Sequence, residues 1–280
     1  MAERICDLIK GSFINDYWTA GYKAEVSFDT LLTPVIEEII QTKFPTAKYV
    51  TKEFPILRKS FNDKVKSGFD SINVDYVLSD KDKVYFVELK TTMDSIDKIQ
   101  ITNYENILKN TFDQYVDDFI RLLNHNSASG IGDDAFQKQY NDLLEEDDLL
   151  KLFKTICMIK EIPDETDTEN TKDFYRTTAV DYLKNRRNQI TKDKKSELSG
   201  KNKTLFQAGQ ILDYCISNSQ NTDCLRNKKI QIVYLLPSNP ENNKLPKEFR
   251  YVNIVEALKE LEGTNPYCKF LWDIASEIFN

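Results

Sequence analysis

Two acidic residues and a lysine stand out in the largely apolar stretch VDYVLSDKDKVYFVELKTT, which spans residues 74–92. Asp75 lies near its start, and Glu88 and Lys90 lie near its end. Carboxylates are costly to bury unless they are paired, hydrogen-bonded or bound to a cation. Residues of these types in such a setting are therefore candidates for chemistry that uses a metal ion or a proton.

The same stretch is typical of a β-hairpin, because two half-apolar runs flank the polar turn SDKDK. If the turn is centred on residues 81–82, Val77 faces Phe86 and Asp75 faces Glu88. Directly opposed residues have Cβ atoms about 4.5–5.5 Å apart, and like charges at that spacing destabilise the sheet. Some other interaction must therefore offset the repulsion between the two carboxylates.

Strand alternation adds the lysine, because Glu88 and Lys90 are two residues apart and share a face with Asp75. Two carboxylates suit Mg²⁺, and Mn²⁺ can substitute for it. A neighbouring lysine can help to deprotonate water and can stabilise charge on a phosphate, as metal-assisted hydrolysis requires. The alternative is a half-buried salt bridge among the three side chains with a purely structural role.

The elements around the hairpin follow from hydrophobic periodicity. They predict an α/β fold in which a mixed central β-sheet is flanked by helices. The expected elements are an amphipathic helix over 28–44 ended by Pro45, a strand over 48–59 with Pro55 at an edge or bulge, helical segments from the end of the hairpin to 123, a helix over 204–217, a buried strand over 228–237, and helices that close the chain.

The chain is expected to form a single domain over residues 1–280, with a helical insertion at about 110–200 and C-terminal helices at 238–280. Its 280 residues, 40% of them hydrophobic and 30% charged, can bury a sizeable core. No apolar run has the length of a signal peptide or a membrane span. The five cysteines form no CxxC pair, which indicates reduced thiols, no zinc knuckle and a cytoplasmic location.

The single histidine, His125, lies in NHNSASGIGDD and is interpreted as a solvent-exposed loop residue rather than a catalytic one. The GIG of this loop is followed by acids and not by a helix, so it does not predict a phosphate-binding loop.

A basic segment over residues 184–203 contrasts with the formal net charge of −7. It holds eight lysines or arginines against two acids, a local excess of six positive charges. Such a run is either a solvated loop or an arm that contacts nucleic-acid phosphates. The candidate nucleic-acid-binding residues are Arg186, Arg187, Lys194 and Lys195.

An acid on one strand followed by acid-x-Lys on the next resembles the signature of the PD-(D/E)XK nuclease superfamily. Here the signature reads Asp75, then Glu88-Leu89-Lys90. Val74 replaces the signature proline, a departure that members commonly show. The expected order αβββ and then αβ is also similar to the restriction-endonuclease-like core, over about 24–110 and 203–237.

The resemblance implies a Mg²⁺-dependent nuclease that hydrolyses phosphodiester bonds, with DNA as the expected polymer and no membrane partner. It implies that Asp75 and Glu88 are metal ligands, that the Leu89 carbonyl completes the coordination, and that Lys90 is the catalytic cation.

Superfamily members often add a glutamate from the first helix and a Gln or Tyr from a later one. Glu25, on the extended apolar stripe of the first helix, is preferred over Glu38. Two segments, IDKIQITNY and FQAGQILDY, each place a Gln four residues before a Tyr. The second directly precedes the last core strand, which favours Gln207 or Gln210.

Two other classes of function stay open. One is a non-cleaving member of the same fold that binds nucleic acid or a protein partner, which the acidic total charge favours. The other is an unrelated α/β interaction protein in which the hairpin acids are salt-bridged.

Overall fold

The computed structural model describes two long stretches in the first half of the chain, most of the C-terminal region and a few residues between them. The described residues are 28–62, 70–116, 118–119, 122, 207, 210–211, 214, 225, 228–240 and 244–279. The chain divides into a first unit of Met1–Tyr49, Asp75–Lys109 and Ile230–Asn280, and a second unit of Val50–Val74 and Asn110–Lys229.

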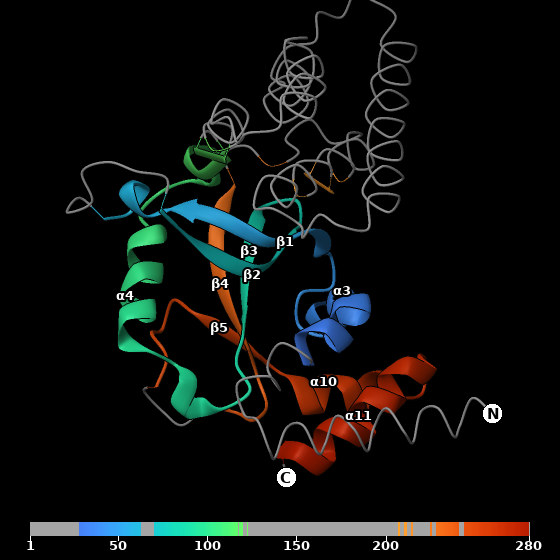
Figure 1. The fold of residues 1–280 in the computed structure, drawn as a ribbon. Helices are drawn as coiled ribbons and strands as arrows, with labels where there is room; N and C mark the ends of the chain where they lie inside the picture. Colours follow the sequence, from blue (N-terminus) through green and yellow to red (C-terminus); the bar gives the residue numbers. More distant parts are fainter. Residues whose placement is uncertain are drawn as a thin grey trace, which may run out of the picture. The chain divides into compact units, whose positions relative to one another are not determined.

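Five strands form one sheet in the order β1-β2-β3-β4-β5 (Figure 1). β2 pairs with β3 antiparallel and β4 with β5 parallel, so the sheet is mixed. The predicted class, a mixed sheet flanked by helices, is confirmed. The strand bounds are β1 Lys48–Leu57, β2 Ser71–Ser79, β3 Lys83–Leu89, β4 Lys229–Leu236 and β5 Arg250–Asn253.

The hairpin has the register expected from its turn, with Val77 paired to Phe86. Asp80 builds the turn, because one of its carboxylate oxygens accepts the backbone N–H groups of Asp82 and Lys83, each at 2.8 Å. The same carboxylate accepts the hydroxyl of Tyr85. A short turn held in this way fixes which residues of β2 and β3 face each other.

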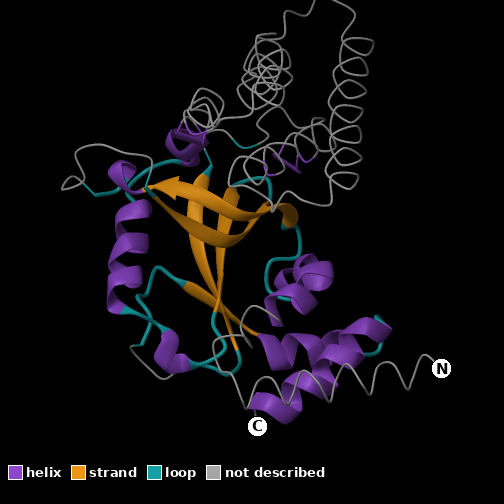
Figure 2. Cartoon of the chain, in the orientation of Figure 1, coloured by secondary structure: helices purple, strands orange, loops and turns teal. Residues whose placement is uncertain are grey.

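One face of the sheet packs against three helices of the first unit. The helices are α3 (Ile36–Gln41), α10 (Ile254–Leu261) and α11 (Pro266–Phe279). Tyr76, Leu78, Val87, Leu89 and Leu235 join their apolar side chains in one core. Because side chains alternate along a strand, the residues between them point to the other face. There, α4 (Lys98–Ile107) lies on the opposite side of the strands from α10 and α11 (Figures 1 and 2).

The first helix is interrupted at Pro34. Residues 28–32 are helical, Thr33–Val35 form the 3₁₀ helix η1, and α3 follows. Proline has no N–H to donate to the preceding turn, and the hydroxyl of Thr33 bonds the carbonyl of Asp29 at 2.8 Å. The predicted helix over 28–44 is therefore interrupted by a 3₁₀ stretch at Thr33–Val35, and α3 ends at Gln41.

In the second unit, β1 is the edge strand expected to carry Pro55, since proline cannot donate to a ladder. Gln207 and Gln210, both helical, contact residues of this strand. The amide of Gln207 donates to the carbonyl of Lys52 at 3.1 Å, and Gln210 accepts the hydroxyl of Thr51 at 2.8 Å.

The other strand and helix predictions hold where they can be checked. β4 and α11 lie where a buried strand and a closing helix were expected, whereas the four-residue β5 was not predicted. No helix among the described residues is long and apolar enough to cross a membrane. Glu25, His125, most of the 110–200 insertion and the basic segment 184–203 lie outside the described residues, so those predictions stay predictions.

Candidate functional site

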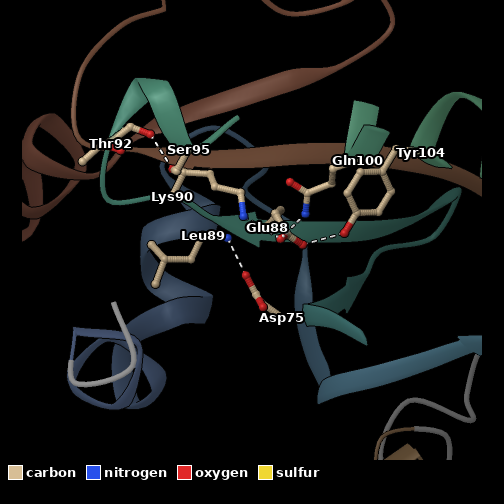
Figure 3. A network of polar contacts seen from close by, with 8 residues as sticks. All are labelled: Asp75, Glu88, Leu89, Lys90, Thr92, Ser95, Gln100 and Tyr104. Carbon is tan, nitrogen blue, oxygen red and sulfur yellow. Dashed lines mark hydrogen bonds and ion pairs between the residues drawn. The ribbon is translucent and has the colours of Figure 1, made fainter. Parts of the chain in front are cut away.

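Asp75 lies where the β2–β3 ladder ends. The last paired residues are Tyr76 and Val87, so Asp75 and Glu88 are the next residues on the two strands. The carboxylate of Asp75 accepts the backbone N–H of Leu89 at 2.7 Å (Figure 3). A side chain thus takes the place of a backbone carbonyl, and the ladder stops beside the two acids.

Glu88 is almost fully buried, with 5% of its surface exposed, and three side chains donate to it (Figure 3). Lys90 donates to Oε1 at 3.0 Å, and the amide of Gln100 donates to the same oxygen. The hydroxyl of Tyr104 donates to Oε2 at 2.5 Å. We call Asp75, Glu88, Lys90, Gln100 and Tyr104 the carboxylate site.

The start of α4 sets the position of the two helix residues. Asp97 caps the helix by accepting the N–H of Ile99 at 2.9 Å, which satisfies one of the donors left open at a helix start. Gln100 and Tyr104 are four residues apart and therefore lie on one face of α4. That face is turned to Glu88, because both side chains reach it.

β4 lies next to β3 and fixes the lysine. The backbone N–H of Lys90 donates to the carbonyl of Leu235 at 3.0 Å. Tyr234, the preceding residue of β4, lies on the same side of the sheet as α4. Its ring meets that of Tyr104 edge-on at 6.3 Å and stacks on Phe249 at 6.0 Å. These three rings form an apolar wall beside Glu88.

Burial and like charge act together on Asp75. Burial is the larger cause and the charge of Glu88 the second, and they raise the pKa of Asp75 to about 8. The N–H of Leu89 and the charge of Lys90 act in the opposite direction, but they do not outweigh the first two. A carboxyl group in this state binds a proton at neutral pH, and a cation placed between the acids would replace that proton.

The first helix contributes Asp29 rather than Glu38 to this region. The charge of Asp29 also raises the pKa of Asp75, and its carboxylate accepts the hydroxyl of Tyr76. Glu38 acts instead on Cys268 of α11, whose pKa is raised first by burial and then by the charge of Glu38. Of the acids that the structure describes in the first helix, Asp29 is thus the one that influences the carboxylate site.

The carboxylate site fits a hard divalent cation in its donor set, because it offers carboxylate oxygens from two adjacent strands. One oxygen of Asp75 accepts Leu89 N–H, and no described residue donates to the other. Glu88 would have to release Lys90 or Gln100 from Oε1 to bind a metal. Among the described residues, no three His, Cys, Asp or Glu side chains are close enough to form a metal site without water or substrate.

The structure brings together the three residues of the Asp75, Glu88-x-Lys90 signature. Gln207 and Gln210 bond residues of β1, whereas Gln100 and Tyr104 of the other Gln-x₃-Tyr segment bond Glu88. Position along the chain favoured Gln207 or Gln210, whereas the hydrogen bonds to Glu88 come from Gln100 and Tyr104. Asp29 and Tyr234 gave no signal, because one looked like a solvated helix residue and the other like part of an apolar strand.

Comparison of the chain with protein-family models, with curated proteins and with solved structures found no match. Function is therefore inferred from the residues of the carboxylate site and the elements that hold them.

Proposed function

We propose that this protein is a Mg²⁺-dependent nuclease that hydrolyses phosphodiester bonds, with DNA as the expected polymer. The observation that carries the proposal is the placement of two carboxylates, Asp75 and Glu88, at one end of a hairpin with Lys90 beside them. The order of the described elements supports it, because a helix, β1, β2, β3, α4 and β4 follow one another as in the PD-(D/E)XK core.

Each residue of the carboxylate site has a role in this proposal. Asp75 and Glu88 would hold the metal, with the carbonyl of Leu89 as a further oxygen ligand. Mg²⁺, when bound, supplies Lewis-acid polarisation of the phosphate. Lys90 stabilises the negative charge that develops on the phosphate oxygens. Gln100 and Tyr104 orient the carboxylate of Glu88 through their hydrogen bonds.

The first helix adds a further acid in this proposal, and Glu25 remains the predicted one. Glu25 lies outside the described residues, and Asp29, four positions later in the sequence, is the acid of this helix that acts on Asp75.

A second candidate is a protein of the same fold that binds nucleic acid or a protein without cleaving. The donors around Glu88 favour it, since Lys90, Gln100 and Tyr104 already engage both of its oxygens. In that case the network is structural, and Lys90 neutralises a buried acid.

A cleavage panel combined with calorimetry separates these candidates. Circular, linear, single-stranded and branched DNA, and RNA, are incubated with wild type, Asp75→Asn and Lys90→Met, with Mg²⁺ or with chelator. Cleavage that needs metal and is lost in both variants supports the proposed function, and linear product from circular DNA identifies an endonuclease.

Calorimetric titration with Mn²⁺ measures whether the protein binds a divalent metal. Metal binding without cleavage of any polymer favours the non-cleaving candidate. The absence of metal binding by wild type would contradict the proposed function and favour a structural network.

A further inference from the structure

One buried polar atom beside the carboxylate site has no hydrogen-bond partner within the described part of the chain. It is the hydroxyl oxygen of Tyr234, a residue with 0% of its surface exposed. A hydroxyl buried without a bond costs free energy that phenylalanine at the same position would not cost. A buried hydroxyl that the fold tolerates in this way calls for an explanation.

Packing determines where this hydroxyl lies. The ring of Tyr234 stacks on Phe249 with an interplanar angle of 24°, and Tyr104 meets it at 88°. Burial raises the pKa of Tyr234 first, and the negative charge of Glu88 raises it further. The ring of Tyr234 thus lies edge-on to that of Tyr104, whose hydroxyl donates to Glu88, and Tyr234 is close enough to Glu88 to be influenced by its charge.

Glu88 depends on Lys90 in the described arrangement. The side chains of Lys90 and Glu88 are 12% and 7% exposed, and Nζ lies 3.0 Å from Oε1. In the proposed function Lys90 acts on a phosphate, so it must leave Glu88 at that step. Glu88 would then lose its only cationic donor among the described residues while it stays shielded from water, which is unfavourable for a carboxylate.

We propose that Tyr234 is a positioning residue for Glu88. The hydroxyl of Tyr234 donates to the Glu88 carboxylate when Lys90 turns away from it. The reason for Lys90 to turn away rests on the proposed function. Because packing fixes the ring of Tyr234, the side chain of Glu88 makes the adjustment. Tyr104 keeps Oε2 in both arrangements, and Tyr234 replaces the donor that Oε1 loses.

A double-mutant cycle without divalent metal tests this role. Thermal melts compare wild type, Tyr234→Phe, Lys90→Met and the double variant. Phenylalanine keeps the ring and removes only the hydroxyl. We expect Lys90→Met to lower the Tm by at least about 2 °C more in the Tyr234→Phe background than in wild type, because Glu88 then keeps Gln100 and Tyr104 but lacks both Lys90 and its proposed replacement, Tyr234.

The matched control is Tyr85→Phe. Tyr85 is a buried tyrosine whose hydroxyl bonds Asp80 at the hairpin turn, 2.5 Å away. Its effect should add to that of Lys90→Met without coupling. Equal effects of Lys90→Met in wild type and in the Tyr234→Phe background would overturn the proposal.

If Lys90→Met does not fold, Gln100→Leu removes a different donor from Glu88 and the same cycle is measured with it. A wild-type protein that binds no metal and cleaves nothing would overturn the proposed function, and the melts would still decide the role of Tyr234.

Discussion

At the scale of single residues, the carboxylate site is defined by two acids that would repel each other if nothing lay between them. The structure gives each a different neighbourhood. Glu88 has three side-chain donors, while Asp75 has one backbone donor and a raised pKa. Substitutions at Lys90 and Asp75 therefore separate catalysis from stability.

Replacing Lys90 by alanine should leave metal binding unchanged or stronger, because a competing cation is removed. Cleavage should fall on the order of 100-fold or more, as expected when a charge-stabilising group is removed. Calorimetric titration with Mn²⁺ and a cleavage time course measure the two effects. If the network is only structural, the variant instead melts far below wild type, and Mg²⁺ gives wild type no added stability.

The pH dependence of stability should reveal Asp75. Its pKa is raised from 3.8 to about 8 in the folded, metal-free protein, so the folded state holds the proton more tightly than the unfolded chain does. A raised pKa contributes stability that is present below about pH 4 and lost as pH rises through about 8. The Tm of wild type should therefore fall over this range relative to Asp75→Asn. Parallel curves for the two proteins would contradict the raised pKa.

At the scale of elements, α4 and the hairpin together hold the residues of the carboxylate site. The hairpin supplies Glu88, and one face of α4 supplies two of its donors. The cap at Asp97 fixes where that face begins. The helix therefore contributes to the geometry of the site as much as the strands do.

Tyr104→Phe should lower the free energy of unfolding by about 1–3 kcal/mol, because it leaves a buried oxygen of Glu88 without its donor. Urea denaturation measures the loss. Tyr85→Phe, which removes one donor from Asp80 beside the exposed turn, should cost less because water can replace that donor. Equal losses of free energy in the two variants would show that the buried hydrogen bond of Tyr104 contributes no more to stability than the bond of Tyr85.

Much of this element-scale organisation could be predicted from the sequence, for identifiable reasons. The polar turn and the alternation on both sides of it determined the pairing of Val77 with Phe86. The choice between two Gln-x₃-Tyr helices could not be made, because periodicity reveals a helix face but not the strand that it covers. Nor could Asp29 be found, since its effect on Asp75 depends on how the first helix lies against the sheet, which a sequence pattern does not show.

At the scale of the whole molecule, charge distribution is the feature that bears on a polymer substrate. The formal net charge is −7, while the segment 184–203 is strongly basic. Such a protein can bind a polyanion only through local clusters of positive charge, because its total charge repels phosphate.

If the basic segment binds DNA, affinity should weaken steeply with salt through counterion release. Replacing Arg186, Arg187, Lys194 and Lys195 together by glutamine should flatten the plot of log K against log salt by about 0.9 for each phosphate that is no longer neutralised. Fluorescence anisotropy with a labelled duplex over a series of salt concentrations measures the slope. The same slope in both proteins would identify the segment as a solvated loop.

The bond from Lys90 N–H to the Leu235 carbonyl has a consequence for biosynthesis. A ribosome releases the hairpin and α4 long before β4, because a large part of the chain lies between Ile107 and Lys229. A nascent chain halted in that interval would carry both acids and the lysine, yet it would lack the strand that holds the lysine backbone and the ring of Tyr234. The carboxylate site is therefore completed late in translation, when segments distant in sequence finally pair.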